Sequence, residues 1–234
     1  MFSRHVGFVG AVLFLAALNL PADEARPYGI EKRVLWTTSR VVGSPEPPSP
    51  YATEPAFPKL KFDHPTDIVS APGSDRLFVA EHLSGHIYSF PNRTDADQAE
   101  LFLDPHQEGR EIWSLAFHPG FATNGFVYFC YNDKKPKPDR NRVSRLHVAP
   151  GNPLRADADS EYIVLEWPTG GHNGGCLKFG RDGCLYISTG DGAGIGDELN
   201  TGQFLGDLLG SVLRINVNQS DWAIRMQFPP TIRL

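Results

Sequence analysis

Cysteine is scarce in this chain: there are three among 234 residues, and none follows a CxxC, CxxCH or zinc-type spacing. The sequence therefore lacks the usual pattern of a metal-binding or redox motif. Two of the three, Cys176 and Cys184, flank an expected β-hairpin. A four-residue turn at 180–183 would pair Cys184 with Phe179, which leaves these two cysteines poorly placed for a disulfide. We expect Cys130, Cys176 and Cys184 to be small buried strand residues, with at least one thiol unpaired.

The chain also lacks an excess of positive charge, since 22 lysines and arginines face 27 acidic residues and the net charge is −5. This balance argues against a general binder of nucleic acid or anionic membranes. The hydrolase motifs GxSxG and HExxH are absent. The 23 glycines and 20 prolines predict frequent turns and no long helices.

Long apolar runs are missing except at the N-terminus. There, Arg4 and His5 precede an apolar run at 6–18, and small or polar residues follow, with candidate cleavage points at Ala22 and Ala25. This pattern predicts a secretory signal peptide over residues 1–22, and hence a secreted or periplasmic protein. The run is too short to favour a membrane span. The alternatives are an uncleaved anchor and a buried terminal strand.

From residue 67 onward, one pattern of short strands and turns repeats three times. Each unit contains three expected strands, which are 67–70, 77–81 and 86–90, then 113–117, 126–131 and 142–148, then 176–179, 184–189 and 211–217. The apolar positions Phe78, Val127 and Leu185 correspond and lie 49 and 58 residues apart. A period of about 50 residues with three or four short strands predicts a β-propeller. The alternative is an all-β chain whose strand-turn-strand units do not form a repeat.

The three units predict only part of a propeller, because closed propellers have about 4–8 blades. Residues 101–103 and 162–166 can supply an outermost fourth strand to the first two units, and no such segment is left for the third. We expect a proline-rich linker or arm at 23–58, a partial propeller at 59–222 and a divergent tail at 223–234. The linker could hold a short strand near Val34. The chain would then be a fragment or would assemble with another copy.

The stretch GGHNGGCLKFGRDGCLYISTGDGAGIGD, residues 170–197, brings a base and a carboxylate together. His172 precedes one strand of the expected hairpin and Asp191 follows the other, so antiparallel pairing puts both at one end, on the rim of the propeller channel. A histidine can take a proton near neutral pH, and a carboxylate can fix its tautomer and support its charge. The surrounding glycines would let a flat ligand approach the backbone. The alternative is a turn histidine and a capping aspartate.

Other interpretations of the same loop are weaker. GDGAGIGD at 190–197 has the composition of a dinucleotide loop, but Asp197 stands where the third glycine of GxGxxG belongs. Asp191 and Asp197 could be calcium ligands, although the EF-hand spacing is absent. We predict no protein metal site. His118 is expected to be a structural turn residue, and the lysine-rich segment 134–140 a solvated loop or a patch for an acidic partner.

Three segments in order resemble the glucose/sorbosone dehydrogenase family, which includes soluble quinoprotein (PQQ-dependent) glucose dehydrogenase and aldose sugar dehydrogenases. The segments are RLFVAEHLSGHIYSF at 76–90, IWSLAFHPGFATNGFVYFCY at 112–131, and GGHNGGCLKFGRDGCLYISTGDG at 170–192 with LLGSVLRINV at 208–217. The resemblance implies a six-bladed propeller that uses pyrroloquinoline quinone (PQQ) and Ca²⁺. It also implies a small sugar or aldehyde substrate.

The resemblance further implies roles for individual residues. His172 matches the family's general base, which takes the proton of a sugar hydroxyl while hydride passes to the quinone. Asp191 matches the aspartate that supports this base. We predict that His172, Asn173 and Gly192 contact the cofactor. The family's quinone-binding arginines and lysine and its calcium ligands come from blades beyond residue 222. Glu111 and Trp113 replace residues that are small or aliphatic in the family.

Three functions follow from these observations. The first is a quinoprotein-type oxidoreductase acting on a sugar or aldehyde. The second is a non-enzymatic extracellular propeller that binds a partner and lacks the cofactor, so the sequence leaves open whether the chain is an enzyme. The third is a metal-dependent propeller hydrolase such as a lactonase, which would need several converging carboxylate or amide ligands. We rank it last because the stretch supplies one good rim carboxylate. No nucleic acid partner is expected, and no membrane span after signal cleavage.

Overall fold

The computed structural model describes residues 52–105, 109–135, 137–151, 153–202 and 204–218. The predicted signal peptide, most of the proline-rich segment with its possible strand near Val34, and the tail at 223–234 lie outside the described residues. The strands described below all belong to residues 54–234, one of two units into which the chain divides. No helix in this described part is long and apolar enough to cross a membrane.

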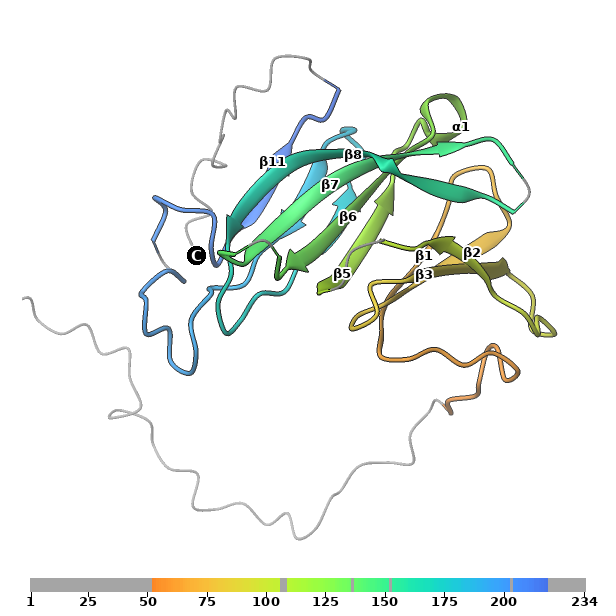
Figure 1. Cartoon of the computed structure of the whole chain (residues 1–234), viewed down its shortest axis with the longest axis horizontal. Coiled ribbons are helices and arrows are strands. Elements are labelled where there is room, and N and C mark those ends of the chain that lie inside the picture. Colours follow the sequence, from red (N-terminus) through yellow and green to blue (C-terminus); the bar gives the residue numbers. More distant parts are fainter. Residues whose placement is uncertain (1–51, 106–108, 136, 152, 203, 219–234) are drawn as a thin grey trace, which may run out of the picture. The chain divides into compact units, whose positions relative to one another are not determined.

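The described chain forms three antiparallel sheets (Figure 1). The first sheet, in the order β1-β2-β3-β4, comprises Pro65–Ser70, Arg76–Glu81, Ile87–Pro91 and Glu100–Leu103. The second, β5-β6-β7-β8, comprises Arg110–Phe117, Phe126–Asp133, Arg140–Ala149 and Arg155–Pro168. The third, β11-β10-β9, comprises Val212–Ile215, Leu185–Ser188 and Cys176–Phe179. This arrangement confirms the all-β fold with three blades of a propeller, including the fourth strands expected in the first two blades.

One feature of the second blade was not expected. The loop between β5 and β6 contains a single helical turn, α1 (Phe121–Asn124), which ends at Gly125 in the left-handed conformation. Its chain reversal is fixed by the preceding histidine: Nδ1 of His118 accepts hydrogen bonds from Gly120 N at 3.0 Å and from Asn124 Nδ2 at 2.8 Å. The expected structural role of His118 is therefore confirmed.

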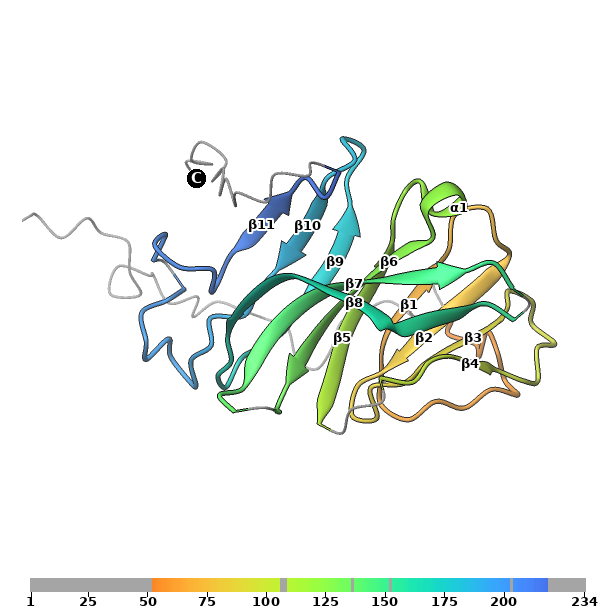
Figure 2. The same ribbon diagram turned by 45° about the horizontal axis from the view of Figure 1, so that its top comes forward.

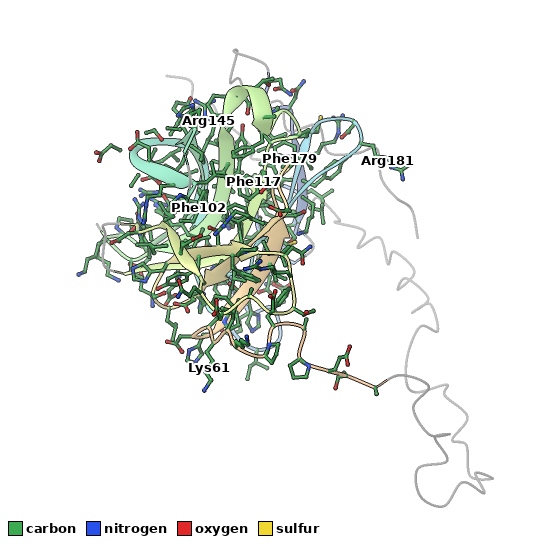
Figure 3. The ribbon with its side chains drawn as sticks, turned by 90° about the vertical axis from the view of Figure 1, so that its right-hand side faces the viewer. Lys61, Phe102, Phe117, Arg145, Phe179 and Arg181 are labelled. Carbon is green, nitrogen blue, oxygen red and sulfur yellow. The ribbon has the colours of Figure 1, made fainter. Side chains whose placement is uncertain are left out.

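The second sheet lies between the other two (Figure 2). One core cluster joins it to the first sheet, and Phe78 lies at its centre, with the rings of Phe102 and Phe117 at 4.8 and 4.6 Å between centroids. Figure 3 labels the latter two. A second cluster joins it to the third sheet through residues that include Leu177 and Leu185. The repeat positions Phe78, Val127 and Leu185 are all fully buried, as equivalent blade positions should be.

Burial along the strands follows from this order of the sheets. In β6 every residue after the first is buried, because both faces of the middle blade are covered. In β10 buried and half-buried residues alternate, because one face packs on the second sheet. The strands β6 and β10 therefore occupy equivalent positions in their blades, although β6 is buried on both faces and β10 on one.

The hairpin of the third blade corrects one prediction. Phe179 pairs with Leu185 and Cys176 with Ser188, so Cys184 is not the partner of Phe179. The turn at 180–183 does form, closed by Gly183 N and Gly180 O at 3.0 Å, but Gly183 has φ +76°. A glycine in this conformation adds a bulge after the turn, so that Gly180 faces Cys184 instead.

The three cysteines are free, where the sequence predicted at least one unpaired thiol, but they are not all buried. Cys130 and Cys184 are buried, whereas Cys176 is exposed at the start of β9, so the prediction was wrong for Cys176. Burial raises the pKa of the Cys130 thiol to about 12, which keeps it protonated and unreactive.

Candidate functional site

One end of all three sheets gathers the loops that carry the candidate residues. This end, which we call the rim, is marked by the strand pairs Pro65 with Glu81, Arg110 with Asp133 and Cys176 with Ser188. The inner strands β1, β5 and β9 begin there, and β2, β6 and β10 end there. Backbone hydrogen bonds tie the first two blades at this point, with Ile112 N donating to His82 O at 3.1 Å.

His172 and Asp191 meet at the rim. Nδ1 of His172 lies 3.0 Å from Oδ1 of Asp191. Because a carboxylate oxygen accepts, Nδ1 carries the proton and donates, and the lone pair is left on Nε2. The imidazole is 57% exposed, while the carboxylate is only 24% exposed. Asp191 is also held by Ala193 N, which donates to the same Oδ1 at 3.1 Å. The arrangement is a solvent-accessible base oriented by a half-buried carboxylate.

The two segments that carry this pair extend the β9–β10 hairpin beyond its strands. His172 N donates to Ala193 O, and Gly192 N donates to His172 O, both at 3.0 Å. Gly190 N donates to Asn173 O at 2.7 Å. The backbone around His172 is therefore bonded on both sides of the residue to the segment that carries Asp191.

The glycines of these segments have a packing role. A Cβ added to Gly170 would overlap the backbone of Gly192, and one added to Gly190 would overlap the carbonyl oxygen of His172. These positions have no side chain because the two segments run against each other there. The sequence suggested that the glycines admit a ligand, but Gly170, Gly171 and Gly190 lie against neighbouring backbone.

Asn173 and Gly192, the other predicted cofactor contacts, lie in the same two segments. The Asn173 side chain makes three hydrogen bonds: Oδ1 accepts from Gly170 N at 2.8 Å and from Asn141 Nδ2 at 3.1 Å, and Nδ2 donates to Gly170 O at 3.0 Å. Gly192 is buried, with Leu209 at the position that a Cβ would face. Of the three predicted contacts, His172 is the one whose side chain is exposed.

Asp197, the alternative calcium ligand, caps the loop that follows. Its Oδ1 accepts from Thr201 N at 2.9 Å and from Gly202 N at 3.1 Å. Thr201 in turn bonds through Oγ1 to the carbonyl oxygen of Asp191. Among the described residues, no three His, Cys, Asp or Glu side chains gather as a metal site requires.

Glu111 and Trp113 also lie at the rim. Trp113 is the extra residue of a β-bulge in β5, between Ile112 and Ser114. Bulges of this kind re-aim a side chain, and the Trp113 ring packs against that of His82 with centroids 4.1 Å apart. Glu111 forms an ion pair with Lys134. Both residues are thus used in contacts at the rim.

Asn141, in contrast, was not singled out in the sequence. It is fully buried in β7, yet its amide reaches Asn173 in the segment that carries His172. The contact spans 32 residues and two blades. No signal in the sequence singles it out, because β7 reads RNRVSRLHVA and carries several other polar residues.

Comparisons with known proteins agree with the propeller fold. The model of a family described as glucose/sorbosone dehydrogenase matches residues 62–223. The Hedgehog-interacting protein of Mus musculus is 34% identical over 170 residues, which cover 64% of this chain and 23% of that protein. The Homo sapiens protein is 33% identical with the same coverage. The chain therefore spans under a quarter of the length of these curated relatives.

Solved structures share the fold. The PQQ-bound aldose sugar dehydrogenase of Streptomyces coelicolor superposes with a TM-score of 0.53 at 21% identity, over 66% of this chain and 45% of that one. A glucose dehydrogenase superposes with a TM-score of 0.51 at 17% identity, over 67% and 45%. At these identities the likeness shows the propeller fold and nothing finer.

Proposed function

Because the chain belongs to the glucose/sorbosone dehydrogenase family, whose model matches residues 62–223, we propose that its rim is the proton-accepting part of an oxidoreductase site for a sugar or aldehyde. His172 is the general base. The observation that carries the proposal is the 3.0 Å contact between Nδ1 of the exposed His172 and Oδ1 of the less exposed Asp191. The protein would act outside the cytoplasm, in line with the predicted signal peptide.

The chemistry of the pair supports this role. With its Nδ1 proton donated to Asp191, His172 offers the Nε2 lone pair to a substrate hydroxyl. When Nε2 takes the proton, the imidazolium that forms lies beside a carboxylate, which stabilises its charge. General base catalysis of this kind contributes about 10²–10⁴-fold to a rate. Oxidation also releases a hydride from the carbon that bears this hydroxyl, and the hydride needs an acceptor. The family resemblance implies that PQQ with Ca²⁺ is this acceptor.

The described residues fit only part of a site for that acceptor. A quinone with several carboxylates needs cationic partners, and the rim lysine Lys134 is paired with Glu111. The side chain of Asn173 makes three hydrogen bonds within the protein and Gly192 is buried. No cluster of three ionisable ligands for Ca²⁺ occurs in the described part of the chain. The residues described here thus fit proton transfer and do not by themselves fit PQQ or Ca²⁺.

This mismatch favours a second candidate, a non-enzymatic extracellular binding module built on the same propeller. The 34% identity to the mouse Hedgehog-interacting protein supports it, since that protein's name describes an interaction and not a reaction. In that case the His172–Asp191 pair would be an inherited feature of the loop.

Titration of the chain with PQQ in the presence of Ca²⁺, followed by an aldose-dependent dye-reduction assay, separates the two candidates. Saturable quinone binding with turnover that is lost in His172→Ala supports the oxidoreductase. Absence of quinone binding by the intact, folded chain overturns it and leaves the binding module. Quinone binding with turnover that is unchanged in His172→Ala would overturn the role of His172 as the base.

A further inference from the structure

Asn141 joins the second blade to the connection that carries His172. Its Nδ2 donates to Pro168 O and to Asn173 Oδ1, both at 3.1 Å. Pro168 is the last residue of β8, and Asn173 lies three residues before β9. One amide group therefore holds both ends of the short crossing between the two blades, and His172 lies within that crossing.

Asn173 transmits this restraint to the base. Its side chain closes the crossing on itself through two hydrogen bonds with the backbone of Gly170. Its own carbonyl accepts from Gly190 N at 2.7 Å. Because Asn173 directly follows His172, its position sets where the His172 Cα lies relative to Asp191. The imidazole then reaches Oδ1 of Asp191 from that fixed point.

We propose that Asn141 is a positioning residue for His172, which acts from within the second blade through Asn173. A buried amide with two partners is restrained far more than a surface contact, since breaking either bond leaves a polar group without water. A displacement of the base by about 1 Å is enough to cost roughly 10²-fold in rate. The inference rests on the proposed role of His172, but the geometry that it concerns can be observed without any activity.

Asn132 provides a matched control. It is the strand partner of Asn141, on β6, and its side chain lies on the same face of the sheet. It is also buried, with 4% exposed against 0% for Asn141. No hydrogen bond joins the Asn132 side chain to residues 168–173, all of which the structure describes. Replacing either asparagine removes a buried amide from the same pair of strand residues, but only the replacement of Asn141 removes hydrogen bonds to the crossing.

The test uses nitrogen NMR of the full chain carrying ¹⁵N-labelled histidine, since the ring signals of His172 report which nitrogen carries the proton. In the unsubstituted chain we expect the proton on Nδ1. In Asn141→Ala we expect the signals to move towards a mixture of the two tautomers, as the contact with Asp191 loosens. In Asn132→Ala they should stay in place. Unchanged signals in Asn141→Ala, or equal changes in both variants, would overturn the inference.

If Asn141→Ala does not fold, Asn141→Ser decides the question, because the shorter side chain keeps a polar group in the strand but cannot hold Pro168 and Asn173 together. The variant that combines Asn141→Ala with Asn173→Ala should shift the His172 signals no further than Asn173→Ala alone, since Asn141 is proposed to act through Asn173. Additive shifts would overturn the inference. A chain with the proton on Nδ1 that lacks turnover would refute the proposed function alone. If the unsubstituted chain is active and its His172 signals do not change in Asn141→Ala, the positioning role alone would be refuted.

Discussion

Oγ of Ser114 donates a hydrogen bond to Oδ2 of Asp67 at 2.6 Å, and so links the innermost strands of the first two blades. Oγ of Ser114 also accepts a hydrogen bond from Leu177 N, on the innermost strand of the third blade, at 3.0 Å. Leu115 N also donates to Asp67 Oδ2, at 3.2 Å. One hydroxyl and one carboxylate therefore tie three strands together. Without them the Leu115 N–H and the Leu177 N–H would lose these partners.

Loss of this link should destabilise the fold. Ser114→Ala leaves the buried Leu177 N–H unpaired and removes the nearest partner of Asp67, so we expect a loss of about 1–3 kcal/mol in the free energy of unfolding. Ser160→Ala is the control, since the Ser160 hydroxyl also accepts from a backbone N–H, that of His147, and donates to an oxygen, Asp157 O, but both bonds are exposed. It should cost no more than about 0.5 kcal/mol. Equal losses in urea unfolding would contradict the account.

The close approach of the two rim segments gives a second prediction. Gly190→Ala places a methyl group on the carbonyl oxygen of His172, so the segments must separate, at a cost of about 1–3 kcal/mol. The matched control is Gly151→Ala, where the nearest atom is at 3.4 Å, an ordinary contact. Thermal unfolding of both variants checks this. A melting temperature that falls no further for Gly190→Ala than for Gly151→Ala would argue against the packing role.

The pH dependence of stability should contain a contribution from His118. Burial lowers the pKa of His118, although its hydrogen bond to Asn218 opposes the shift. The unfolded chain therefore binds this proton more readily than the folded chain. The contribution to stability is complete above the unfolded value of about 6.5, and is lost as the pH falls below it towards the folded value.

His118→Gln should reduce that acid-side loss, because an amide does not titrate in this range. The measurement is the free energy of unfolding of both chains at about pH 7.5 and about pH 5.5, on either side of the unfolded pKa. We expect the unsubstituted chain to lose more between these two conditions than the variant. An identical loss would mean that His118 does not contribute.

Asp191→Asn tests the orientation of the base. An asparagine can present an N–H to Nδ1 of His172, which would move the proton to Nε2 and remove the lone pair that faces the substrate. In the dye-reduction assay with PQQ and Ca²⁺, we expect kcat to fall roughly 10²–10⁴-fold with little change in KM. Asp197→Asn is the control, because Asp197 bonds only its own loop. A kcat that falls equally in both variants would remove the special role of Asp191.

Much of the fold could be read from the sequence because its signals are local. The strand 176–179 was predicted with the bounds that β9 has, and the repeat of Phe78, Val127 and Leu185 marked equivalent buried positions in three blades. The hairpin register was wrong because it depends on the left-handed conformation of Gly183, which the letters GRDG do not specify. The strand β8 is much longer than the expected 162–166, because it pairs with β7 along most of its length.

The site could be predicted only in part for a similar reason. His172 and Asp191 could be placed together because a hairpin brings its two ends to one point. The contact from Asn141 to Asn173 crosses from one blade to the next, and no local pattern encodes it. The glycines were interpreted as room for a ligand, since a sequence does not distinguish this from room for another backbone segment.

The most direct test of the central claim is chemical rescue of His172→Ala in the dye-reduction assay with PQQ and Ca²⁺. The account predicts that turnover falls roughly 10²–10⁴-fold and that added imidazole restores part of it, because the lost group is a proton acceptor. His64→Ala, which removes a rim histidine that is paired with Asp63 at 2.6 Å, should leave turnover unchanged. Full turnover in His172→Ala without imidazole would contradict the account.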